Sequence, residues 1–122
     1  MEQNLDEITI NGIKYVREEN KRKAESLDGM EYKIVRTYSA GVFAGYLEKK
    51  EGMEVTLRNA RRIWYWEGAA SLSQLAMDGT SKPGNCKFPK EVSKIVLTQV
   101  IEILDVTERA KKSIDGVKVW EE

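Results

Sequence analysis

The middle of the chain reads Arg58-Asn59-Ala60-Arg61-Arg62-Ile63-Trp64-Tyr65-Trp66-Glu67-Gly68-Ala69-Ala70-Ser71-Leu72-Ser73-Gln74-Leu75-Ala76. No other segment combines so many arginines and aromatic residues. The first half of this stretch fits the alternating period of a β-strand. Alternation predicts that Arg58, Arg62, Trp64 and Trp66 share one face of the strand and that Arg61 lies on the other.

The second half of the stretch predicts a helix that begins near Ser71. The residues before it, Gly68-Ala69-Ala70, are small and indicate a tight strand-to-helix turn. Such a turn can offer free backbone N–H groups to an anion, although the same small residues also suit plain tight packing. The turn matches neither a Walker loop nor a dinucleotide fingerprint, so we expect no cofactor.

Composition limits the function classes. The chain has 122 residues, 41% of them hydrophobic and 33% charged, which suits one ordinary globular domain. Twenty basic residues balance twenty acidic ones, so no overall positive field is available to hold a nucleic acid polymer. The single cysteine, Cys86, excludes an intramolecular disulfide, and we expect it to be a small buried residue. We find no signal peptide and no apolar run that could span a membrane, and we expect a cytosolic protein.

Histidine is absent from the sequence. This removes the commonest general base and the commonest transition-metal ligand. No pair of carboxylates forms a recognisable catalytic motif. We therefore expect a protein that is not an enzyme and binds no metal.

The N-terminal part, residues 1–31, predicts a β-hairpin followed by a charged segment. Ile8–Ile10 and Ile13–Tyr15 flank Asn11-Gly12, a strong two-residue turn signal that pairs Ile10 with Ile13 and Ile8 with Tyr15. Residues 18–29 suit either a short solvated helix or a linker. We expect residues 1–31 to be an appendage.

The main domain, residues 32–122, predicts an α+β fold built on an antiparallel meander. Strands are expected at 32–38, 42–48 and 53–66, and short helices near 71–78 and 107–114. Gly45 indicates a bulge or a close backbone approach in the second strand. Residues 95–106 predict one further strand, central or in an interface because both of its faces are apolar, with a helix as the alternative.

Candidate ligand residues follow from side-chain chemistry. Guanidinium groups match phosphate oxygens, and aromatic rings stack on bases. Each of these residues also has a plain structural interpretation, as part of a solvated face or of the core. The predicted ligand-binding residues are Arg36, Arg58, Asn59, Arg62, Trp64, Trp66, Ser71, Phe88 and Arg109.

Several blocks of the sequence resemble a family of small bacteriophage and prophage proteins. The resemblance covers about residues 33–120 and rests on residues 35–43, 59–76, 85–88 and 113–120. Within this grouping the chain is similar to the phage anti-Thoeris sponge proteins. That resemblance implies a β-rich homo-oligomer, built from dimers that can assemble further, which acts in the cytoplasm of the infected or lysogenic bacterial host.

The resemblance also implies a function without catalysis. The sponges bind a cyclic ADP-ribose-type signalling nucleotide, glycocyclic ADP-ribose, and keep it from activating the defence effector; some also bind cyclic oligonucleotides. The alternative from the residues alone is a nucleic-acid-binding or phage-assembly accessory protein, against which the balanced charge argues. The apolar 95–106 segment and the hairpin face independently suggest a homo-oligomer.

Overall fold

The computed structural model describes the backbone of residues 7–10 and 13–16, and residues 22–122 in full. The N-terminal hairpin pairs β1 (Glu7–Ile10) with β2 (Ile13–Val16). Its register sets Ile8 opposite Tyr15 and Ile10 opposite Ile13, as predicted. The predicted Asn11-Gly12 turn lies outside the described residues.

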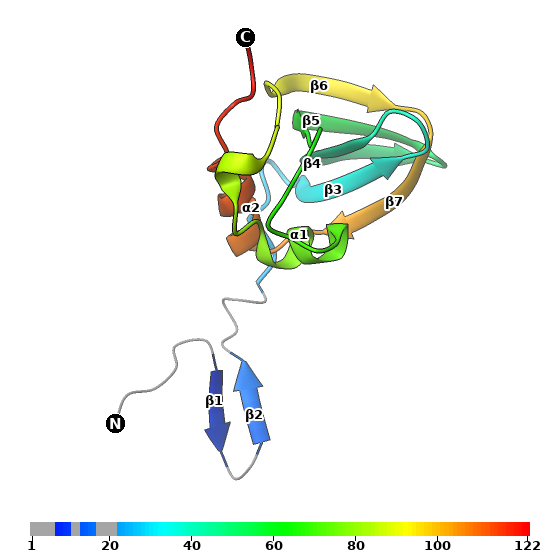
Figure 1. Cartoon of the computed structure of the whole chain (residues 1–122). Coiled ribbons are helices and arrows are strands. Elements are labelled where there is room, and N and C mark those ends of the chain that lie inside the picture. The colour runs from blue at the N-terminus through cyan, green and yellow to red at the C-terminus, as the bar shows by residue number, and fades with distance from the viewer. Residues whose placement is uncertain (1–6, 11–12, 17–21) are drawn as a thin grey trace.

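The main domain is a five-stranded antiparallel sheet with two short helices, which confirms the predicted α+β class (Figure 1). The strands are β3 (Glu31–Thr37), β4 (Val42–Glu51), β5 (Glu54–Arg62), β6 (Val92–Leu97) and β7 (Val100–Asp105), in the spatial order β6-β5-β4-β3-β7. The helices are α1 (Leu72–Asp78) and α2 (Glu108–Asp115), and the 3₁₀ helix η2 spans Pro83–Asn85. Neither α-helix of the described chain is long and apolar enough to cross a membrane.

The single strand predicted at 95–106 is wrong. Thr98 and Gln99 form a bend that divides the segment into β6 and β7, which are the two edge strands of the sheet. Three strands separate these edges, and β6 and β7 run in the same sense, yet only two residues join the end of β6 to the start of β7 (Figure 1). The sheet must therefore curl. Apolar residues occur on both faces because the concave face needs a core of its own.

A β-bulge in β5 overturns the predicted partition of the arginines. Arg58 pairs with Tyr46 and Arg61 with Ala44, so two residues of β5 oppose Gly45 alone. Asn59 in the bulge has a φ of 50°. The extra residue shifts the alternation by one. Arg58 and Arg61 therefore share a face, and Arg62 lies on the other.

Glycine is required opposite this bulge. A Cβ on Gly45 would lie 3.0 Å from both Ala60 Cα and Arg58 O. The close backbone approach predicted for Gly45 is confirmed.

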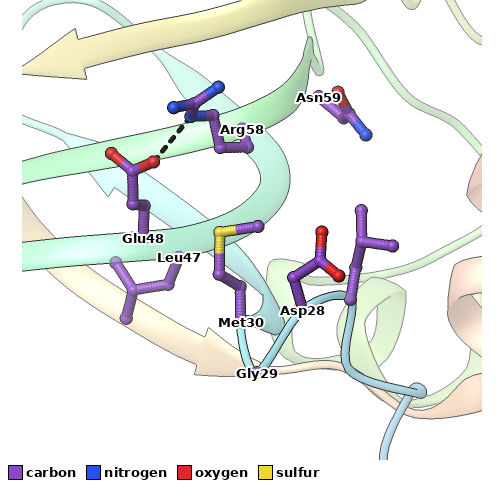
Figure 2. A pocket seen from close by; sticks show the side chains of 8 residues that line it. Asp28, Gly29, Met30, Leu47, Glu48, Arg58 and Asn59 are labelled. Carbon is purple, nitrogen blue, oxygen red and sulfur yellow. Dashed lines mark hydrogen bonds and ion pairs between the residues drawn. The ribbon is translucent and has the colours of Figure 1, made fainter.

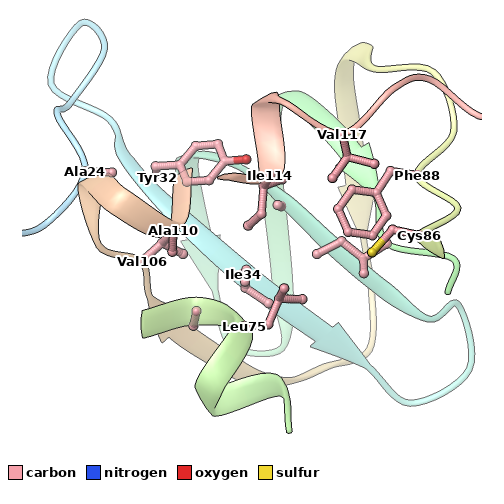
Figure 3. Packing of buried hydrophobic residues seen from close by; sticks show 13 residues of the cluster. Ala24, Tyr32, Ile34, Leu75, Cys86, Phe88, Val106, Ala110, Ile114 and Val117 are labelled. Atoms are coloured by element: carbon pink, nitrogen blue, oxygen red, sulfur yellow. The ribbon is translucent and has the colours of Figure 1, made fainter. Parts of the chain in front are cut away.

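Two hydrophobic clusters stabilise the sheet, one on each face. The helix-side cluster includes Ile34, Leu75, Phe88, Val106 and Ile114, and joins the sheet to both helices (Figure 3). The concave-face cluster consists of Val35, Phe43, Val55, Leu57, Ala60, Leu97 and Val100. Full burial of one such aliphatic side chain contributes about 1.5–3 kcal/mol.

The helices begin where the sequence predicts. The Ser71 hydroxyl accepts from the backbone N–H of Gln74 at the start of α1, and the Thr107 hydroxyl accepts from Ala110 N at the start of α2. Gly79 and Gly116 are the C-terminal caps. Local capping chemistry thus determines both helix boundaries.

Within the predicted appendage, residues 22–30 pack on the main domain and contain no helix. Ala24 is buried in the helix-side cluster, and its N–H donates to Val106 O at 2.9 Å. Leu27 and Met30 exchange two backbone hydrogen bonds around Asp28-Gly29, both of which have positive φ. This two-residue turn is the hairpin geometry that Asp-Gly favours.

Candidate functional site

The structure divides the predicted arginine cluster between two surface hollows. The Arg58 hollow, of about 650 Å³, is lined by Leu27, Asp28, Gly29, Met30, Leu47, Glu48, Arg58 and Asn59 (Figure 2). The Arg62 hollow, of about 300 Å³, is lined by Ser39, Ala40, Gly41, Val42, Arg62, Ile63 and Trp64. The β5 bulge is the reason for this division, because it turns Arg58 and Arg62 to opposite faces.

The Arg58 hollow is the larger, but its charge is unsuited to a phosphate. Arg58 Nε donates to Glu48 Oε1 at 2.7 Å, so the guanidinium already has a carboxylate partner. Asp28 adds a second carboxylate to the lining. One cation against two carboxylates leaves a net negative charge, which repels an anionic ligand.

The Arg62 hollow has the opposite charge. Its lining contains one cation and no acidic residue. Arg62 NH1 donates to Ala40 O at 3.2 Å, and the guanidinium lies 4.5 Å from the centroid of the Phe43 ring. Within residues 22–122, no carboxylate lies at ion-pair distance from Arg62. A half-buried guanidinium that is held in place by a carbonyl and a ring keeps donors for a phosphate oxygen.

Trp64 connects the Arg62 hollow to an exposed aromatic surface. Its side chain is 62% exposed, and its ring is nearly parallel to that of Trp120, with centroids 6.5 Å apart and an interplanar angle of 10°. Lys87 Nζ lies 5.5 Å from the Trp120 ring and 5.8 Å from the Tyr65 ring. The Tyr65 hydroxyl donates to Glu67, which raises the pKa of Tyr65.

Arg61 serves the fold instead of a ligand. It is 7% exposed and donates to four backbone carbonyls, those of Phe88, Pro89, Ile114 and Val117. The carbonyl of Ile114 belongs to the last turn of α2, where carbonyls lack partners within the helix. Burial lowers the pKa of Arg61. We call this arrangement the Arg61 clamp, because it joins β5, the loop before β6 and the C-terminal segment.

Three other predicted residues are occupied by packing or capping. Phe88 is completely buried in the helix-side cluster, so its ring has no surface on which a ligand can stack. Trp66 lies beyond the end of β5, is half-buried against the same cluster, and donates its Nε1–H to Ala69 O at 3.2 Å. Ser71 caps α1.

The turn before α1 is also used internally. The Gln74 side chain accepts from Ala70 N at 2.7 Å. A Cβ on Gly68, whose φ is 86°, would lie 2.5 Å from Lys82 N and 2.7 Å from Ser81 N. The small residues therefore serve tight packing. Cys86 is buried beside this turn, as predicted.

The last two predicted arginines lie outside the linings of both hollows. Arg36 on β3 forms an ion pair of 3.0 Å with Glu102 on β7, opposite it in the sheet. Arg109 on α2 lies 4.0 Å from Asp78 at the end of α1. Both side chains are half-exposed. The structure thus brings together Arg62 with Trp64, and Arg58 with Asn59, and groups none of the others with these pairs.

Sequence reasoning missed Trp120, Lys87 and the 39–41 loop. The loop joins β3 to β4. It lines the hollow together with Arg62 because β5, the strand that ends at Arg62, pairs with β4. Trp120 reaches Trp64 because its N–H donates to Phe88 O at 3.0 Å and Val119 forms a parallel bridge with Phe88. Only the density of aromatic residues at Trp64–Trp66 was visible in the sequence.

Comparison with known families gives one match. Residues 30–114 match the model of a family described as "Domain of unknown function (DUF6948)". The chain belongs to this family. The matched segment includes all five strands of the main sheet, both hollows except Leu27, Asp28 and Gly29, and α2 up to Ile114; Trp120 lies beyond it. Comparisons with curated proteins and with solved structures give no match.

Proposed function

We propose that this protein binds an anionic signalling nucleotide at the Arg62 hollow and holds it without chemical change. The observation that carries the proposal is the placement of Arg62 and the exposed Trp64 in one hollow whose lining has no acidic residue. A cation that matches phosphate oxygens then lies beside a ring that can stack on a base. Ligand pockets of this kind usually have volumes of about 300–1,000 Å³.

The resemblance to the anti-Thoeris sponges supplies the ligand to test first. Glycocyclic ADP-ribose has an adenine, a pyrophosphate and ribose hydroxyls, and the Arg62 hollow offers a ring, a guanidinium and backbone groups of the 39–41 loop. The hollow is small for the whole molecule, so a second protomer that completes it agrees with the predicted homo-oligomer. Under this proposal the protein acts in the cytoplasm of the infected or lysogenic host and blocks activation of the Thoeris effector.

Isothermal titration calorimetry with glycocyclic ADP-ribose tests the proposal. We expect micromolar or tighter binding, which requires at least about 8 kcal/mol, and release of intact ligand on heating. Arg62→Gln should weaken binding at least tenfold. Arg58→Gln is the matched control, because its guanidinium is already paired with Glu48, and it should bind like the wild type. Absence of binding, or recovery of a cleaved product, contradicts the proposal.

The alternative is a protein that binds single-stranded nucleic acid or acts in phage assembly. Exposed Trp64, Tyr65 and Trp120 favour it, because aromatic side chains stack on bases with little sequence preference. A fluorescence titration with a single-stranded oligonucleotide at low and moderate salt separates the two functions. Tight binding that weakens steeply with salt, together with no binding of cyclic nucleotides, would favour the alternative.

A further inference from the structure

Burial in a hydrophobic core does not explain why Trp64 and Trp120 lie together at the surface. Their side chains are 62% and 48% exposed, and neither belongs to the two hydrophobic clusters. Exposed apolar area of this size has a cost in water, and contiguous exposed aromatic surface often marks a binding site. The two rings nevertheless keep nearly parallel planes.

The internal structure of the protein holds this pair in place. Ile63 is buried, and its N–H donates to Val42 O at 2.8 Å, which determines where the chain leaves β5 just before Trp64. On the other side, Arg61 donates to Val117 O at 2.6 Å, and Trp120 N donates to Phe88 O. The C-terminal segment therefore runs beside the loop before β6 (Figure 1). Arg61 is a positioning residue for Trp120.

Charge at the pair suits a nucleotide. Lys87 Nζ lies 5.5 Å from the centroid of the Trp120 ring and 5.8 Å from that of the Tyr65 ring, so the aromatic surface has a cation beside it. Arg62 precedes Trp64 by two residues, which places their Cα atoms at most about 7 Å apart. One ligand can therefore contact the guanidinium with a phosphate and the rings with its base.

We propose that Trp64 and Trp120, with Lys87, form the base-stacking half of the nucleotide site. This inference rests on the proposed function and adds Trp120 and Lys87, which lie outside the lining of the Arg62 hollow. The ligand class is a purine nucleotide whose phosphate binds Arg62. Planar base and parallel indole rings stack favourably, whatever the hydrogen-bonding pattern of the base.

Calorimetry with glycocyclic ADP-ribose, ADP-ribose and AMP tests the inference on the full chain. For the ligand that the wild type binds most tightly, Trp120→Ala should weaken binding about ten- to a hundredfold. Trp120→Phe retains a ring and should lose only a few-fold. Met53→Ala removes another exposed apolar side chain, 54% exposed, and should bind like the wild type.

A second measurement does not depend on the stability of the Trp120 variants. The chain has three tryptophans, so Trp66→Phe leaves only Trp64 and Trp120 to fluoresce. Saturation with the same ligand should quench this emission. Trp120→Ala affinity within twofold of the wild type, or unchanged emission at saturation, overturns the inference while the proposed function stands. If the wild type binds none of the three nucleotides, both fail.

Discussion

Replacing Arg61 with methionine tests whether the Arg61 clamp stabilises the domain. Methionine is apolar and unbranched and replaces the arginine stem up to about Nε, so the substitution removes four hydrogen bonds and leaves the carbonyls of Phe88, Pro89, Ile114 and Val117 without this donor. A hydrogen bond from a charged donor contributes about 1.5–3 kcal/mol. The simple sum exceeds the real loss, because burial of the guanidinium itself has a cost and methionine recovers apolar contact.

We therefore expect the free energy of unfolding to fall by about 3–5 kcal/mol, because each buried carbonyl left without a donor costs about 1–3 kcal/mol. With a slope of about 1–3 kcal/mol per molar of urea, the midpoint should move down by roughly 2 M. Equilibrium urea unfolding followed by circular dichroism measures this shift. Emission from Trp120 should also change under native conditions, because the clamp holds the segment that carries it.

Arg109→Met is the control for loss of an arginine. Its guanidinium is half-exposed and has one ion pair, at 4.0 Å, so the expected change is within about 0.5 kcal/mol. A loss below about 1 kcal/mol for Arg61→Met would refute the reasoning. The carbonyls would then be satisfied by water or by their backbone donors, and the clamp would contribute little to stability.

Two further predictions concern stability. Gly68→Ala should destabilise the domain by more than about 2 kcal/mol, because the positive φ of Gly68 and the nearby Lys82 N leave no room for a Cβ. Gly84→Ala is the control, because a Cβ there has nothing within 4 Å, and it should be neutral in the same urea assay. Equal effects of the two substitutions would contradict this prediction. The hydrogen bond from Lys33 lowers the pKa of Asp105. A carboxylate with a lowered folded-state pKa contributes stability above its unfolded pKa and loses it as the pH falls. Thermal unfolding between about pH 5 and pH 2 should therefore depend less on pH in Asp105→Asn than in the wild type, and parallel profiles would contradict this.

Local signals in the sequence predicted much of the fold. The hairpin register followed from one turn and alternating residues, and both helix starts followed from capping residues. The bend at Thr98 and Gln99 was missed because neither residue is a strong turn former and the flanking residues all favour strands. Only the curl of the whole sheet requires that bend.

The candidate site was harder to predict for the same reason. The bulge at Asn59 depends on Gly45 in the neighbouring strand, and it reversed the relation between Arg58 and Arg62. Alternation alone therefore grouped the wrong arginines. Trp120 lies far from Trp64 in the sequence, and their contact depends on hydrogen bonds that Arg61 makes with backbone carbonyls. Every residue has a backbone carbonyl, so hydrogen bonds to carbonyls select no residue type and leave no motif in the sequence.

The Arg61 clamp also makes one part of the molecule insensitive to acid. Its acceptors are carbonyls, which do not titrate, and its donor remains charged throughout the physiological range. Between β3 and β7, by contrast, Lys33 pairs with the carboxylate of Asp105, a group that acid protonates. Acid therefore weakens the β3–β7 edge first, while the end of β5 and the segment with Trp120 stay joined. The Arg61 clamp should therefore hold the segment with Trp120 in place at pH values at which the Lys33–Asp105 pair is already lost.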